Sequence, residues 1–116
     1  MKRINSHCIG VDQGSTILFS DFEHGGEMWA GSGARSTRST VTFSQPFTAP
    51  PSVHVSISMW DLDQKTNFRA DISSEDVTET GFVILFKTWG DTRVARIRAD
   101  WTAIGPLRHE DDWDLG

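Results

Sequence analysis

The sequence predicts an all-β fold, specifically a six-stranded antiparallel β-sandwich. Apolar residues recur at every second position over several short segments, which is typical of strands with one buried face. Turn-forming residues separate these segments at intervals of about ten residues, as in known sandwiches. No window keeps a helical period over two turns. Together these observations favour two packed antiparallel sheets.

The expected strands cover residues 16–22, 41–47, 53–60, 68–72, 82–89 and 95–103. Residues 53–60 and 95–103 show the clearest alternation of apolar and polar side chains. Residues 82–89 are apolar on both sides, so we expect a central strand that is covered on both faces. Prolines end the 41–47 strand, because proline cannot donate to the hydrogen-bond ladder.

Chain length and composition limit the number of domains, the possible disulfides and the kinds of partner. A chain of 116 residues predicts one domain, and we place it at residues 1–105, followed by an acidic tail at 106–116. The single cysteine, Cys8, has no partner for an internal disulfide. The net charge of -5 argues against a nucleic-acid partner.

Targeting features are missing from the sequence. The first residues lack the apolar run of a secretory signal peptide, and no segment reaches transmembrane length. We therefore expect no membrane partner. The compartment is unknown, with the cytoplasm as the default unless a non-standard export route or a larger particle carries the protein out.

We expect no cofactor, no metal and no catalysis. The four histidines are scattered without ligand spacing. Residues 9–16 resemble the first phosphate loop of sugar kinases, but a chain of this size lacks their two-domain cleft, so a strand and turn is favoured. A glycosidase pair such as Asp61 with Asp91 stays open as an alternative, although carboxylates on a sandwich usually serve solubility.

The most distinctive stretch is residues 88–94, which close one expected strand and open the next. Trp89 offers a flat apolar face, and Asp91 offers hydrogen-bond acceptors. Gly90 lets a ligand approach the backbone closely. A sugar ring has one apolar C–H face and a rim of hydroxyl groups, so these residues predict a carbohydrate site. The alternative is a hairpin turn with an exposed aromatic residue.

Two other features have alternative interpretations. Arg96 and Arg98 form an outward stripe that faces the side of Arg69 and Asp71 if the strands are neighbours. Cross-strand ion pairing is favoured over a subunit interface. We expect Trp60 at a rim or a subunit interface rather than in contact with sugar.

Several short segments occur in a defined order between residues 41 and 105. They are Phe47 to Pro51, Ser56 to Ser58 before Asp61 to Asp63, Asn67 to Arg69, Thr80 to Phe82, Thr88 to Val94 and Trp101 to Ile104. In this order they resemble the H-type lectin domain family, whose founding member is a snail agglutinin. The resemblance covers more than half of the chain.

The resemblance implies a non-catalytic protein that binds galactose or N-acetylgalactosamine. It also implies a homotrimer or a hexamer made of two trimers, with sugar sites between neighbouring protomers. The sugar-binding arginine of the family falls on Arg69, and its tryptophan falls on Trp89. The next position, which is polar in known binders, is Gly90 here. The contribution of the first long loop falls near Ser32 to Arg35.

This chain departs from the family at two positions of the site. Gly90 lacks a side chain, and residues 31–38 contain no aspartate or asparagine. Asp91, or Asp61 and Asp63, are the candidates for the missing acceptor. The candidate site is therefore Arg69, Trp89, Gly90, Asp91, Ser32 and Arg35. The alternative to a glycan-binding protein is an adhesion or assembly subunit, for example of a phage-like particle, that keeps the scaffold without binding sugar.

Overall fold

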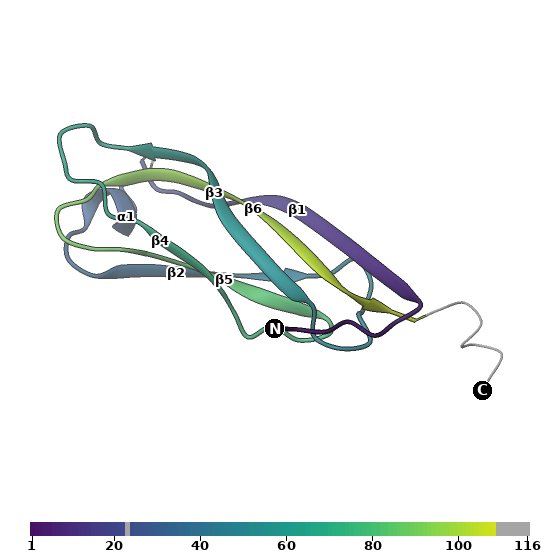
Figure 1. The fold of residues 1–116 in the computed structure, drawn as a ribbon. Helices are drawn as coiled ribbons and strands as arrows, with labels where there is room; N and C mark the ends of the chain where they lie inside the picture. Colours follow the sequence, from purple (N-terminus) through teal and green to yellow (C-terminus); the bar gives the residue numbers. More distant parts are fainter. Residues whose placement is uncertain (23, 109–116) are drawn as a thin grey trace.

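The computed structural model describes residues 1–22 and 24–108 of the chain. Its elements are β1 (Cys8–Ser20), α1 (Glu27–Ala30), β2 (Arg35–Thr42), β3 (Ser52–Leu62), β4 (Asp71–Glu75), β5 (Gly81–Thr88) and β6 (Val94–Leu107). The strands form two antiparallel three-stranded sheets, ordered β1-β6-β3 and β2-β5-β4, which stack as two layers (Figure 1). The all-β, six-stranded sandwich expected from the sequence is confirmed.

Strand β1 begins well before residue 16, where the sequence predicts its start, and it ends at Ser20. Glycine is unfavourable inside a strand unless a neighbour needs the space. Gly14 lies opposite Trp101 of β6, and a Cβ atom at position 14 would lie 2.8 Å from indole atoms of Trp101. The missing side chain therefore makes room for the buried indole, and the strand continues through the glycine.

Strands β2 and β4 also differ from their expected ranges. β2 ends at Thr42, so Phe43 and Phe47 fill the core from the following connection, with ring centroids 5.1 Å apart in an edge-to-face contact. β4 begins only at Asp71, because the preceding residues are held by the turn between β5 and β6 rather than by a neighbouring strand.

The core lies between the sheets in two clusters of buried side chains. One includes Phe82 and Trp101, and the other includes Phe86, Ile97 and Met28 of α1. Full burial of a phenylalanine such as Phe86 contributes about 2–3 kcal/mol. β5 is the middle strand of its sheet, as the sequence predicts. The expected cover on both faces is found only on the inward face, because on the outer face Leu85 is buried but Val83 is half-buried and Lys87 is exposed.

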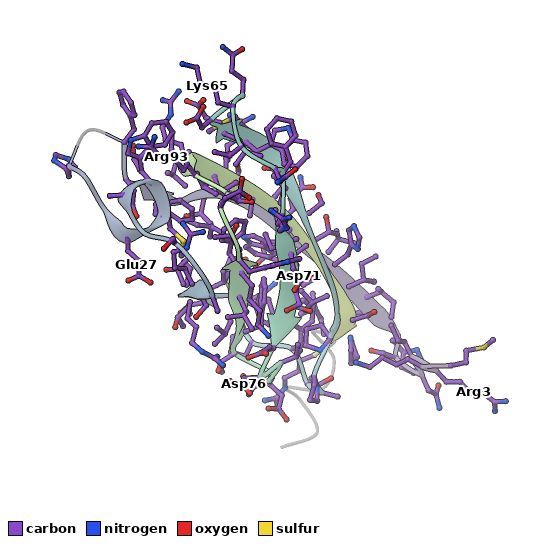
Figure 2. The ribbon with its side chains drawn as sticks, turned by 90° about the vertical axis from the view of Figure 1, so that its left-hand side faces the viewer. Arg3, Glu27, Lys65, Asp71, Asp76 and Arg93 are labelled. Carbon is purple, nitrogen blue, oxygen red and sulfur yellow. The ribbon has the colours of Figure 1, made fainter. Side chains whose placement is uncertain are left out.

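The loops that matter for function gather at one end of the sandwich. α1 lies at this end, and the start of β1 and the end of β6 lie at the other (Figure 1). In Figure 2, Glu27, Lys65 and Arg93 mark the first end and Arg3 the second. β6 extends to Leu107, so the first residues of the expected tail pair with β1. The remaining tail, residues 109–116, lies outside the described residues.

Candidate functional site

The turn after β5 exposes the predicted aromatic residue. Trp89 is 45% exposed. Gly90 has a φ of 71°, in the left-handed region that favours glycine. The Gly90 carbonyl accepts a hydrogen bond of 2.9 Å from the backbone N–H of Gly33, so the loop before β2 is attached to this turn. The turn that carries the indole is therefore held to the loop before β2.

Next to Trp89, a guanidinium and a carboxylate lie side by side. Arg69 Nη1 lies 2.6 Å from Asp91 Oδ1. The side-chain amide of Asn67 donates to both carboxylate oxygens at 3.3 Å. The Asn67 side-chain bond, together with the bond from Arg69, holds the pKa of Asp91 below its usual value. Asp91 is therefore an ionised acceptor at neutral pH, next to a donor of opposite charge.

Two buried threonines fix the Asn67–Arg69 segment against this turn. Thr92 Oγ1 donates to the Asn67 carbonyl at 2.6 Å and accepts the Arg69 N–H at 3.2 Å. Thr88 Oγ1 donates to the Arg69 carbonyl at 2.5 Å. Both threonines are at most 1% exposed. They hold Arg69 beside Trp89. This role could not be predicted from the sequence, because threonine is common in strands.

Arg35 lies beneath the turn rather than on the surface. It is 5% exposed, and its five N–H donors all face backbone carbonyl groups. The acceptors are the carbonyls of Gly33, Glu27, Met28, Gly90 and Thr92, at 3.0, 3.5, 3.1, 3.4 and 2.7 Å. Arg35 therefore has no donor left for a ligand, and it acts by positioning the turn and the loop before β2.

Four of the six predicted site residues lie together: Arg69, Trp89, Gly90 and Asp91. A Cβ atom at Gly90 would lie 3.1 Å from Arg69 Nη1, so the glycine leaves the space that the guanidinium occupies. Ser32 is exposed on the neighbouring loop, one residue before the attachment point at Gly33.

A hollow of about 330 Å³ opens beside Trp89. Its lining consists of Ala34, Arg35, Ser36, Lys87, Thr88 and Trp89. Sequence reasoning did not single out Ser36 and Lys87, because only the pairing of β2 with β5 brings them together. The hollow lies directly against the indole that the sequence predicts as the centre of the site.

The other acidic candidates have partners of their own. Asp61 on β3 pairs with Arg96 on β6 at 3.3 Å. This agrees with the expected cross-strand ion pairing of Arg96. The partner is Asp61 and not Asp71, because Asp71 lies on β4 in the other sheet. Asp63 pairs with Arg93 at 3.4 Å, and the Arg93 guanidinium lies 4.3 Å from the ring centroid of Trp29. Asp91 is thus the acidic candidate that lies beside Trp89 and Arg69.

Two further observations concern the described part of the chain. No group of three or more histidine, cysteine, aspartate or glutamate side chains there is arranged to hold a metal ion. None of its helices has the length and apolar character needed to span a bilayer.

Comparison with known proteins identifies the class. The family model of the H-type lectin domain matches residues 38–104. Because this match covers more than half of the chain, the protein belongs to the H-type lectin domain family. The resemblance stated from the sequence is thereby confirmed.

Individual proteins are similar to this chain in sequence or in fold. A protein named "ATP synthase subunits region ORF 7" of Fuscovulum blasticum is 60% identical over 107 residues, which are 92% of this chain and 93% of that protein. Native recombinant discoidin II of Dictyostelium discoideum superimposes with a TM-score of 0.74 at 23% identity over 90% of this chain. A wild-type discoidin II structure gives 0.73 at 24% identity over 85%. The chain spans only about two fifths of discoidin II, 40% and 37% in the two structures.

Proposed function

We propose that this lectin domain binds galactose- or N-acetylgalactosamine-type glycans without catalysis. The observation that carries the proposal is the exposed indole of Trp89 beside the Arg69–Asp91 pair. The indole packs against the apolar C–H face of a sugar ring. The guanidinium donates charge-assisted hydrogen bonds to ring hydroxyl groups, and the carboxylate accepts from them. Gly90 leaves the space in which Arg69 places its guanidinium at this turn.

Asp91 takes the place of the acceptor that residues 31–38 lack. It is ionised, and two carboxylate oxygens offer about four acceptor positions in all. Arg69 and Asn67 make four hydrogen-bond contacts with these oxygens, and the three contacts from Asn67 are long, at 3.3–3.4 Å. The Asp91 side chain is 55% exposed, so a sugar hydroxyl can reach the carboxylate and replace one of these long contacts. A hydroxyl group on the sugar ring is then bound by donor and acceptor at once.

The family suggests how the domain gains useful affinity. A single small polar ligand buries little area, so each site is weak on its own. A trimer, or a hexamer of two trimers, that presents several sites on one face raises the avidity without any new contact. Ser32 is exposed on the loop before β2, where a neighbouring protomer can share the site.

The test is a calorimetric titration of the purified oligomer with galactose, N-acetylgalactosamine and glucose. The expected result is saturable binding of the galactose-type sugars that Trp89→Ala abolishes. Trp60→Ala is the matched control, because Trp60 is also an exposed indole, 56% exposed, but lies on β3. Unchanged binding in Trp89→Ala, or equal loss in both variants, contradicts the proposal.

A second candidate function is an adhesion or assembly subunit that keeps the scaffold without binding sugar. It is favoured by Gly90, which offers no side chain, and by the pairing of Arg69 with Asp91, which gives each charged group a partner of opposite charge in the absence of ligand. This candidate predicts a folded oligomer in sedimentation velocity that shows no heat with any sugar. Sugar-dependent heat that disappears in Trp89→Ala contradicts it.

A further inference from the structure

The hollow beside Trp89 presents two polar side chains on the outer face of the β2-β5-β4 sheet. Directly opposed residues of paired strands point to the same face. Ser36 lies opposite Lys87, and Arg35 lies opposite Thr88. Arg35 and Thr88 are buried, whereas Ser36 and Lys87 are exposed. At about 330 Å³ the hollow falls at the lower end of the volumes of small-molecule sites.

Lys87 lacks a carboxylate partner within the described residues. Four arginines, Arg38, Arg69, Arg93 and Arg96, pair with aspartate or glutamate at 4.0 Å or less, but Lys87 takes part in no such pair and no side-chain hydrogen bond. This holds although Asp71 lies opposite Lys87 in the β4–β5 register. Lys87 lines the hollow, and its ammonium group has three donors available for a ligand.

The floor of the hollow is already organised. Arg35 is fixed by its contacts to five carbonyl groups, and Thr88 is fixed by its hydrogen bond to the Arg69 carbonyl. Trp89 supplies an apolar wall that is 45% exposed. A ligand that enters the hollow therefore orders few protein groups, which keeps the entropic cost of binding low.

The charged groups near Trp89 differ in how they are paired. Asp91 offsets the charge of Arg69, which suits a neutral sugar ring. Lys87 has no carboxylate in contact within the described residues. The chain as a whole carries a net charge of -5, so its overall field does not favour an anion, and attraction must come from a local cation.

We propose that the hollow is a second subsite, which binds an anionic group on the sugar residue next to the one held by Arg69 and Asp91. The group is a carboxylate or a sulfate ester, and Lys87 is its partner, with Ser36 as an additional donor. This inference rests on the proposed lectin function, because the first sugar residue delivers the second one to the hollow. It adds a preference for acidic glycans that galactose binding alone does not imply.

The test compares three ligands by calorimetry: lactose, lactose with a sulfate ester on its glucose residue, and galactose linked to glucuronic acid. The two anionic ligands are expected to bind about two- to fivefold more tightly than lactose, the range of an exposed ion pair. The preference is expected to fade at about 1 M salt, where the screening length is about 3 Å. The two anionic ligands separate a carboxylate preference from a sulfate preference.

Variants assign the preference to Lys87. Lys87→Gln is expected to reduce the ratio of anionic to neutral affinity to about one. Lys65→Gln is the matched control, because Lys65 is an exposed lysine on a loop at the same end of the molecule (Figure 2), and it is expected to keep the ratio. Asp71→Asn, which removes the carboxylate opposite Lys87, is expected to raise the ratio.

The outcomes separate this inference from the proposed function. Lactose binding with no gain for the anionic ligands overturns the second subsite and leaves the lectin function standing. A preference that survives Lys87→Gln also overturns the subsite. If none of the three ligands binds, and galactose and N-acetylgalactosamine also fail, the lectin function falls and the subsite falls with it.

Discussion

Arg35 makes the strongest single contribution to the geometry of the site, and replacing it tests that role. Arg35→Met keeps an apolar stem of similar length and removes all five donors. Three of its bonds are 3.1 Å or shorter, those to the carbonyls of Thr92, Gly33 and Met28. At about 1 kcal/mol for each net hydrogen bond, the free energy of unfolding is expected to fall by about 3 kcal/mol. For a domain of this size, Tm then falls by about 12 °C.

Urea denaturation followed by tryptophan fluorescence measures this loss. Arg38→Met is the control, because the Arg38 side chain is 57% exposed and its ion pair with Glu75 is worth at most about 1 kcal/mol. Arg35→Met is also expected to weaken sugar binding at a temperature where it stays folded, since the Gly90 and Thr92 carbonyls lose their support. An unfolding free energy within about 0.5 kcal/mol of the parent chain refutes the reasoning.

Three further results are expected. Gly90→Ala places a Cβ atom 3.1 Å from Arg69 Nη1 in a residue with a φ of 71°. The free energy of unfolding measured in urea should fall by about 1–2 kcal/mol, and sugar binding should weaken. An alanine variant as stable as the parent protein would show that the added Cβ atom causes no crowding. Asn67 and Arg69 lower the pKa of Asp91, so the ionised form is favoured by folding. Its contribution is present above the unfolded pKa of about 3.9 and is lost as the pH falls through the lower folded value. Calorimetric sugar affinity should thus be constant from about pH 5 to 8 and decline only below about pH 4, and a decline near pH 6 would point to another group. Asp61→Asn breaks the exposed ion pair with Arg96, so the free energy of unfolding should change by less than about 1 kcal/mol and sugar binding should not change. Release of free sugar from a galactoside by the parent protein, but not by Asp61→Asn, would instead indicate a glycosidase.

The fold could be predicted from the sequence because the pattern that indicates a strand is local. Alternation in residues 53–60 and 95–103 reports which face of a strand is buried, and the structure keeps both segments as strands. Alternation alone places the start of β1 at residue 16 rather than at Cys8, because Gly14 lowers strand propensity. Only the packing of Trp101 against that glycine, 87 residues later in the chain, explains why a strand tolerates it.

The grouping of the candidate site residues could be predicted in part for the same reason. Trp89, Gly90 and Asp91 are contiguous, and Arg69 followed from the family resemblance. The role of Arg35 was not visible, because an arginine in a polar loop gives no sign of burial, and its five acceptors are backbone carbonyls that any sequence carries. The role of Lys87 could not be predicted from the sequence, because the residues that lie beside its side chain depend on how β2, β4 and β5 pair.

The most direct test of the central claim is a broad glycan array probed with the purified protein and, in parallel, with Trp89→Ala and Trp60→Ala. The account predicts selective binding of galactose- or N-acetylgalactosamine-terminated glycans that Trp60→Ala keeps and Trp89→Ala loses. An array with no signal from the folded protein, or a signal that Trp89→Ala leaves intact, contradicts a carbohydrate site at Trp89.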